Sequence, residues 1–328
     1  MQNIGQKTAR KKSINSLVVR DKSLRFVVWI FRALFIIGLC YLFLFPLFYL
    51  VVAAVQDPTA AKDPTVVWIP KQLSLENFKT AFSMLQFIPS LTKTIINSVL
   101  STLAMLVSCS MVGYGFARFR FWESKLAFAL VILIIIVPPQ TIVLSNYLNF
   151  RFFDFLGIMK VTSFVTGKDS VNLLNTCWTS VLPSVFAVGY RAGIFIFIFR
   201  QFFAGQPKEL EEAARIDGCS AFSTFRRIMA PLAVPAFITV LLFSFIWQWN
   251  ESYNAGMFYP DSIKPLAVQL NTLRETFLRD TSSTHYSPTM IRGTMAAGSL
   301  MSILPTLLLY IFTQKYFTES IERSGIVG

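Results

Sequence analysis

Charged residues, histidines and paired cysteines are all scarce in this chain. Only 14% of its 328 residues are charged, and His285 is the single histidine. A lone histidine without neighbouring ligands does not make a metal site. The cysteines are also dispersed, without metal spacing or a dense disulfide framework, so we expect small apolar packing residues and no metal. They are Cys40, Cys109, Cys177 and Cys219.

A phosphate-binding loop is also missing. The nearest pattern, Gly167-Lys168, is followed by Asp169 and lacks the upstream glycine of Gly-x-x-x-x-Gly-Lys-Ser/Thr. We therefore expect the chain to hydrolyse no ATP and to bind no cofactor itself. Energy for uphill transport would have to enter through a partner or an ion gradient.

Apolar residues dominate what is present. Hydrophobic residues make up 54% of the chain, which has 33 phenylalanines and a mean hydropathy of +0.56. A soluble domain could not bury that much apolar surface, whereas a bilayer needs about 20 apolar residues per helix. The sequence predicts an all-α integral membrane protein with six transmembrane helices. They cover about 33–55, 95–116, 126–147, 181–203, 231–253 and 293–313.

The positive charge fits membrane topology better than nucleic-acid binding. The net charge is +13, but lysines and arginines gather beside the apolar runs. Residues 1–25 hold seven of them against one acid, Asp21, and read as a basic cytoplasmic tail before a permease domain at 26–328. With a cytoplasmic N-terminus, the segments on the cytoplasmic side carry seventeen lysines and arginines and the outer segments carry eleven. Cytoplasmic segments of membrane proteins hold the excess of basic residues, so the count predicts both termini on the cytoplasmic side.

A short acidic segment separates the fourth and fifth predicted spans. Three glutamates follow Pro207, a residue that suits a first helical turn, and they lie near the positive end of the helix dipole. Gly218 can adopt the left-handed conformation that ends a helix. Ser220 or Ser223 can then cap a second short helix. Two short helices joined at a glycine would form a compact projection that can transmit force.

This segment resembles the EAA loop of binding-protein-dependent ABC importer permeases. The pattern is Glu-Ala-Ala, three residues, Gly, nine residues, then Ile and Pro, with Ala230 where the family usually has leucine. In that family the loop, here about 205–231, docks in a cleft of a separate ATPase subunit. The resemblance implies that the ATPase-coupling residues are Glu212, Ala213, Ala214, Gly218, Ile228 and Pro231.

The end of the fifth span is too polar for lipid. Residues 247–254 combine aromatic rings with amide and carboxylate groups, and sugars present surfaces that match both. Arg191, between two glycines in the fourth span, has two open interpretations, structural pairing and pathway lining. The candidate substrate-pathway residues are Arg191, Gln248, Trp249, Asn250 and Glu251.

The Trp249-Asn250-Glu251 triplet resembles the corresponding segment of carbohydrate-uptake, MalG-like permeases. That resemblance implies a type I ABC importer in the bacterial cytoplasmic (inner) membrane. Implied partners are a second six-helix permease subunit in a heterodimer, two ATPase subunits that hold ATP and magnesium, and an extracytoplasmic sugar-binding protein. The outer segment at about 255–292 could reach that binding protein. No nucleic acid is expected.

Two alternatives remain open from the sequence. Amino-acid, peptide and phosphate importers carry the same type of loop, so only the fifth span and the overall resemblance favour sugar. A self-contained ion-driven carrier is the second alternative. Such carriers usually need ionisable residues within the membrane, and the predicted spans hold few of them.

Overall fold

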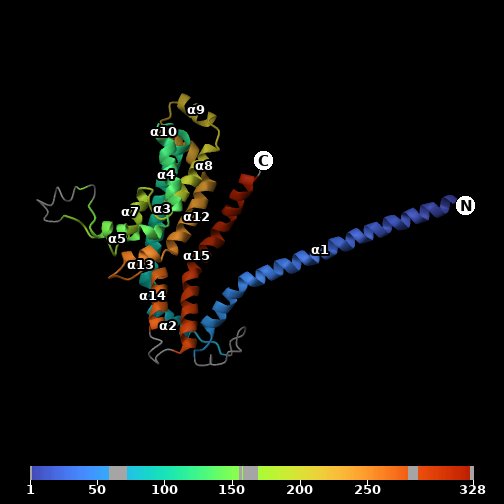
Figure 1. Ribbon diagram of the computed structural model, residues 1–328, viewed down its shortest axis with the longest axis horizontal. Helices are drawn as coiled ribbons and strands as arrows, with labels where there is room; N and C mark the ends of the chain where they lie inside the picture. The colour runs from blue at the N-terminus through green and yellow to red at the C-terminus, as the bar shows by residue number, and fades with distance from the viewer. Residues whose placement is uncertain (1, 59–71, 155–156, 158–168, 280–286, 326–328) are drawn as a thin grey trace.

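The computed structural model is built of helices, as the sequence predicts (Figure 1). It describes residues 2–58, 72–154, 157, 169–279 and 287–325, with side chains between 25 and 315 of those ranges. Within them the only extended pairings are two isolated bridges, Gln56 with Leu73 and Phe153 with Val171. His285 and Lys168 lie outside the described residues.

Apart from the first helix, which projects away, the longer helices form a bundle, and the shorter ones lie at its two ends and on one side (Figure 1). The longer helices are α1 (Gln2–Val55), α3 (Phe87–Arg118), α4 (Ser124–Ile136), α8 (Ala192–Ala204), α12 (Val234–Trp249), α14 (Leu266–Arg279) and α15 (Pro288–Gly325). The shorter α-helices are α2 (Glu76–Met84), α5 (Val143–Arg151), α7 (Trp178–Val185), α9 (Glu209–Ile216), α10 (Ala221–Thr224), α11 (Ala230–Leu232) and α13 (Tyr253–Phe258). A 3-10 turn, η1 (Pro139–Thr141), and a π-helical turn, η2 (Phe225–Met229), complete the described helical elements.

Three described helices are long and apolar enough to cross a bilayer: Arg25–Val55 within α1, α3, and Pro288–Lys315 within α15. A fourth crossing is possible if Ala221–Leu232 and Val234–Trp249, bent by 79°, form one broken span. Six crossings therefore remain a prediction.

The continuous helices predicted at 126–147 and 181–203 are wrong, because both are interrupted. Helix α4 ends at Ile136, just before Pro138 and Pro139, and Val137 is already extended. Proline lacks the amide hydrogen that continues a helix and disfavours helical geometry in the residue before it. The second break lies between α7 and α8, where Arg191 has a left-handed φ of 62°.

Helix α1 contains both the predicted tail and the predicted first span. It projects away from the bundle in Figure 1, and most of its apolar side chains between 26 and 51 are exposed. Its last turn is packed into a corner with α2 and α15. There the buried Asn77 amide donates to the carbonyl oxygens of Ala54 (3.1 Å) and Gln56 (2.8 Å), which caps the end of α1.

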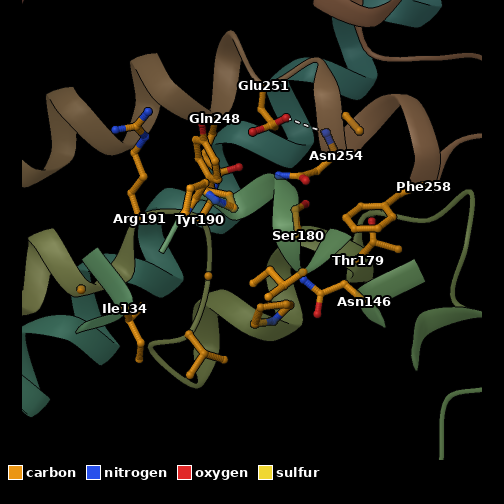
Figure 2. A pocket seen from close by; sticks show the side chains of 18 of the residues that line it. Ile134, Asn146, Thr179, Ser180, Tyr190, Arg191, Gln248, Glu251, Asn254 and Phe258 are labelled. Carbon is orange, nitrogen blue, oxygen red and sulfur yellow. Dashed lines mark hydrogen bonds between the residues drawn. The ribbon is translucent and has the colours of Figure 1, made fainter. Parts of the chain in front are cut away.

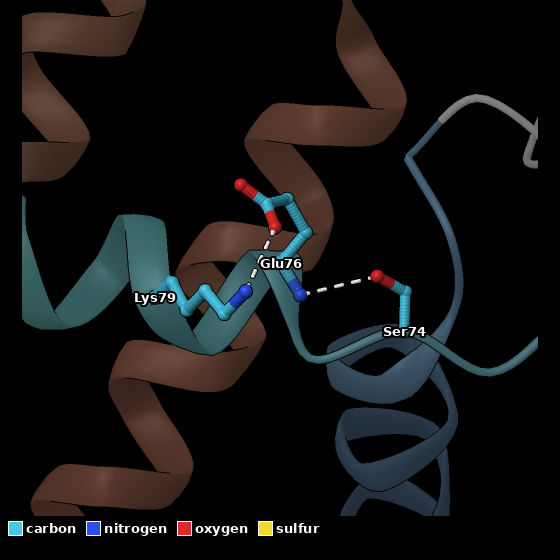
Figure 3. Close-up of polar contacts among 3 residues, drawn as sticks. All are labelled: Ser74, Glu76 and Lys79. Atoms are coloured by element: carbon cyan, nitrogen blue, oxygen red, sulfur yellow. Dashed lines mark hydrogen bonds and ion pairs between the residues drawn. The ribbon is translucent and has the colours of Figure 1, made fainter.

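Helix α2 begins with local polar contacts, drawn in Figure 3. The Ser74 hydroxyl accepts a hydrogen bond from the Glu76 amide at 3.1 Å, and Lys79 lies 3.7 Å from the Glu76 carboxylate. Both charged side chains are more than half exposed, so this ion pair adds little stability. The hydroxyl contact satisfies one amide of the first turn.

Helix α3 is the centre of the bundle and packs against α7, α8 and α12. Its buried face consists mainly of small residues, which allow neighbouring backbones to come close. These residues are Ser90, Thr94, Ser98, Ser101, Thr102, Cys109, Ser110 and Gly113. At Gly113 an added Cβ would lie 2.6 Å from Phe199 Cβ and 3.0 Å from the Arg200 amide nitrogen.

Replacing Gly113 by alanine should therefore destabilise the chain. The α3–α8 contact would have to open, at a cost of about 1–3 kcal/mol for overpacking. Thermal unfolding of the detergent-solubilised chain, followed by tryptophan fluorescence, measures the effect as a lower midpoint. Gly115→Ala is the matched control, because nothing lies within 4 Å of its added Cβ. Equal midpoints for the two variants would contradict the proposed role of this contact.

Candidate functional site

The acidic segment forms the compact projection that the sequence predicts, at one end of the bundle (Figure 1). Helix α9 begins after Lys208, whose carbonyl accepts hydrogen bonds from the Glu211 and Glu212 amides at 3.0 and 3.1 Å. All three glutamates occupy its first turn and Arg215 its last, so charges of both signs favour the helix dipole. Pro207 lies just before the helix instead of inside its first turn.

The turn after α9 has the geometry expected of a glycine-ended helix. Gly218 has a φ of 78° and donates from its amide to the Arg215 carbonyl at 3.0 Å. The Cys219 amide donates to the Ala214 carbonyl at 2.9 Å, which completes a Schellman motif. Ser220 then caps α10 by accepting from the Ser223 amide at 3.3 Å. Of the two predicted caps, Ser220 is the one used.

The predicted coupling residues do not all face outward. Glu212, Ala213, Gly218 and Pro231 are exposed, whereas Ala214 is buried and Ile228 is half-buried in the core. The sequence analysis missed two apolar side chains on this surface. Ile216 is 87% exposed and Phe222 is 60% exposed. Both residues lie on the short helical segments of the projection, Ile216 at the end of α9 and Phe222 in α10.

A buried ion pair, which the sequence analysis also missed, attaches α9 to the bundle. Arg118 Nε, in the last turn of α3, lies 3.1 Å from Glu211 Oε1, and the two side chains are 3% and 7% exposed. Arg118 Nη2 also donates to the Gln206 carbonyl at 2.8 Å. The guanidinium therefore joins three segments: the end of α3, the turn after α8, and the first turn of α9.

A cavity of about 390 Å³ lies away from the projection, among the breaks in the helices (Figure 2). Its walls come from α3, the 133–150 region, α7, the turn before α8, the end of α12 and the α13 region. Both interrupted segments, 137–142 and 188–191, line it. Interrupted backbone at membrane depth is tolerated where it lines a cavity, because its polar groups can then be satisfied.

One acid and one base line this cavity. The Glu251 carboxylate accepts a hydrogen bond from the backbone amide of Asn254 at 2.8 Å (Figure 2). The Arg191 guanidinium lies 4.6 Å from the Trp247 ring centre and 5.3 Å from that of Tyr190. Its interactions among the described residues are thus with aromatic faces, a favourable arrangement for a cation. The other polar groups on the walls are amides and hydroxyls, including Asn97, Asn146, Thr179, Ser180 and Gln248.

The structure brings three of the five predicted pathway residues to the cavity, namely Arg191, Gln248 and Glu251. Trp249 and Asn250 lie outside its lining. The Trp249 indole is buried and donates to the Ser302 carbonyl of α15 at 3.1 Å. The side-chain amide of Asn250 donates to the Ile246 carbonyl one turn earlier in α12. The two glycines beside Arg191 do permit close packing, since an added Cβ at Gly189 would lie 2.7 Å from Ser184 Oγ.

Tyr259, directly after α13, lines the cavity. Its hydroxyl accepts from the Asn97 amide at 2.7 Å and donates to the Thr176 carbonyl at 2.9 Å. Burial raises the pKa of this phenol, so the hydroxyl stays protonated and remains a donor. Lys93 lies 4.5 Å from the same ring centre and donates to Ser262 and to the Ile263 carbonyl, both at 2.9 Å. These contacts hold 259–263 against α3.

Gly218→Ala should loosen the projection. No atom lies within 4 Å of the added Cβ, so the cost is the left-handed backbone alone, about 1–2 kcal/mol. Amide hydrogen exchange of α9 should become faster by roughly tenfold, since about 1.4 kcal/mol corresponds to that factor. Gly205→Ala is the control, because Gly205 has an ordinary φ of −78°. Unchanged exchange in the Gly218 variant would contradict the capping role.

Comparison with known proteins identifies the family of this chain. Residues 109–318 match the family described as "Binding-protein-dependent transport system inner membrane component". The AraQ permease of an arabinooligosaccharide transport system from Halalkalibacterium halodurans is 28% identical, over 88% of this chain and 93% of its own. The DasC permease of a diacetylchitobiose uptake system from Streptomyces coelicolor is 26% identical, over 87% and 92%.

The fold has a close match among solved structures. A subunit of a bacterial ABC transporter for import of the acidic polysaccharide alginate superposes with a TM-score of 0.67, at 21% identity, over 89% of this chain and 96% of its own. The family match covers well over half of the chain, including the projection and much of the cavity wall. The chain belongs to the family of binding-protein-dependent transport system inner membrane components.

Proposed function

We propose that this chain is a permease subunit of an ATP-driven importer for a sugar or oligosaccharide in the bacterial inner membrane. One observation carries the proposal. The same helix bundle has an EAA-type projection at one end of α3 and, toward the other end of α3, a cavity with polar walls among the helix breaks. A chain with both features can receive force from an ATPase and expose a pathway for a solute. It is itself a non-catalytic transport subunit.

Six crossings with both termini in the cytoplasm are part of this proposal. The arrangement of the helices supports it. Helix α3 runs from the α2 end of the bundle to the α9 end, whereas α12 runs back from the α9 end (Figure 1). Helix α15 starts again at the α2 end and returns toward α9. If α4 with η1 and α5, and α7 with α8, count as two broken spans, the chain crosses six times.

The cavity supports a sugar as cargo. Its walls combine apolar surface with amide, hydroxyl, carboxylate and guanidinium groups, and sugar rings present matching apolar faces and hydroxyls. Arg191 and Glu251 provide one charge of each sign, which suits a neutral, hydroxyl-rich solute. Permeases with related sequences are named for arabinooligosaccharides and diacetylchitobiose, both carbohydrates.

Partners supply what the chain lacks. Two ATPase subunits would hold ATP and magnesium and receive the exposed face of α9 and α10. A second, different six-helix permease would cover part of the apolar surface of this one, and lipid the remainder. An extracytoplasmic sugar-binding protein would dock at the opposite end, where the outer segments lie. Closure of the ATPase pair would then push the projection and open the pathway outward.

Reconstitution in liposomes tests this proposal. The chain with its second permease, the ATPase and the loaded binding protein should take up labelled sugar only when ATP is supplied. Glu212→Ala should reduce uptake at least about tenfold, because an exposed charge at the ATPase contact is lost. Co-purification of all subunits is checked separately. Glu123→Gln, an exposed change at the start of α4, is the control.

Two results would overturn the proposal. Uptake by this chain alone, driven by a proton or sodium gradient and indifferent to ATP, would make it a self-contained carrier. A cognate binding protein that selects amino acids, peptides or phosphate would retain the importer and change its cargo.

A matched pair of amide substitutions tests the cavity as the sugar pathway. Gln248→Ala removes a wall residue, whereas Asn250→Ala removes an amide two residues away that lies outside the lining. Transport is measured with saturating loaded binding protein. Gln248→Ala should lower sugar transport by about five- to tenfold, because one hydrogen bond to the sugar is lost. Asn250→Ala should change it by less than about twofold. Equal effects would place the pathway elsewhere.

A further inference from the structure

The ion pair between Arg118 and Glu211 is placed where helix dipoles favour both charges. Arg118 is in the last turn of α3, where the dipole favours a cation, and Glu211 is in the first turn of α9, where it favours an anion. Both side chains are almost completely buried. Glu209 and Glu212, in the same turn of α9, are exposed. The sequence therefore places one acid of the three against the bundle.

Such a pair is weak evidence for stability. Two buried charges lose much of their solvation, and their attraction often only offsets that loss. The pair instead constrains orientation, because moving either side chain away leaves an uncompensated buried charge. A hydrogen bond from Arg118 Nη2 to the Gln206 carbonyl adds a directional constraint to the ion pair. The first turn of α9 is thus held at a defined angle to α3 and to the end of α8.

Helix α3 connects this pair with the cavity. Thr94 and Asn97, on the same continuous helix, line the cavity wall. From Asn97 to Arg118 is about 30 Å at the rise of an α-helix. Near Arg118 the helix is also packed against its neighbours, since the Tyr114 ring centre lies 5.4 Å from that of Phe203 and 5.1 Å from that of Phe225. These contacts pack the end of α3 against α8 and η2, the two elements that flank α9 and α10 in the chain.

We propose that Arg118 and Glu211 are positioning residues that transmit motion of the projection to the cavity through α3. This inference rests on the proposed function, because it assumes that a partner ATPase moves α9. In the assembled transporter, the exposed face of α9 and α10 receives the force. The buried Arg118–Glu211 pair makes α9 and α3 move together, and the Thr94–Asn97 wall of the cavity moves with them.

The test is Glu211→Gln in the complete reconstituted transporter. This change removes the charge and keeps the shape, so the subunits should still assemble and hydrolyse ATP. The number of sugar molecules imported per ATP hydrolysed should fall by about tenfold, because the neutral amide leaves Arg118 as an uncompensated buried charge and loosens the link between α9 and α3. Glu123→Gln, the same change at an exposed glutamate outside α9 and α10, should leave that ratio unchanged.

A charge swap separates coupling from simple stability. Arg118→Glu combined with Glu211→Arg restores an ion pair at the same place. It reverses both charges relative to the helix dipoles and removes the bond to the Gln206 carbonyl, so it should recover part of the ratio. An unchanged ratio in Glu211→Gln, or a loss that the swap does not recover, would overturn the inference. If Glu211→Gln fails to assemble, Arg118→Lys replaces it, since lysine keeps the charge but loses the forked donor geometry. An unchanged ratio in that variant would also overturn the inference.

The two proposals fail in different ways. A wild-type complex that imports no sugar with ATP would remove the proposed function. A wild-type complex that imports sugar normally, beside a Glu211→Gln complex with the same ratio, would leave the proposed function intact and remove only the role of the ion pair.

Discussion

Close packing along α3 is the constraint on which the rest of this structure depends. Lipid is as apolar as leucine, so helices in a membrane gain little from burying hydrophobic side chains against one another. Association then depends on van der Waals contact and hydrogen bonding, which require close backbones. The small residues on the buried face of α3, from Ser90 to Gly113, permit that approach to α7, α8 and α12. Because the cavity and the projection lie toward opposite ends of α3, this packing fixes their relationship.

Polar chemistry at each end follows from this arrangement. At one end the buried pair of Arg118 and Glu211 joins α9 to α3, and Ile216 and Phe222 are exposed on the projection. At the other end Glu251 and Arg191 face a cavity instead of each other, each held by neutral neighbours. In the proposed transporter, the first arrangement would receive force and the second would bind a hydroxyl-rich solute.

Sequence reasoning predicted the elements that local chemistry determines and missed those that depend on distant partners. Hydropathy found the apolar segments, and the acidic start with Gly218 and Ser220 predicted the projection closely. A window of apolar residues does not register a break, so α4 and α8 were each predicted too long. Successive helix residues point about 100° apart. The hydropathy of Gln248 and Trp249 therefore could not reveal that one faces the cavity and the other α15. The partner of Glu211 lies in α3, and no local pattern marks it.

The helix breaks would also provide the places at which the bundle moves in the proposed transporter. Packed interiors deform little and shift between discrete arrangements, so motion concentrates where regular hydrogen bonding is already interrupted. Here the breaks near Pro138 and Arg191 both border the cavity, whereas α3 between them and the projection is continuous. A displacement at α9 would pass along α3 with little loss and be taken up at those two breaks. The same irregular backbone that supplies polar groups to the cavity would then also let its walls move.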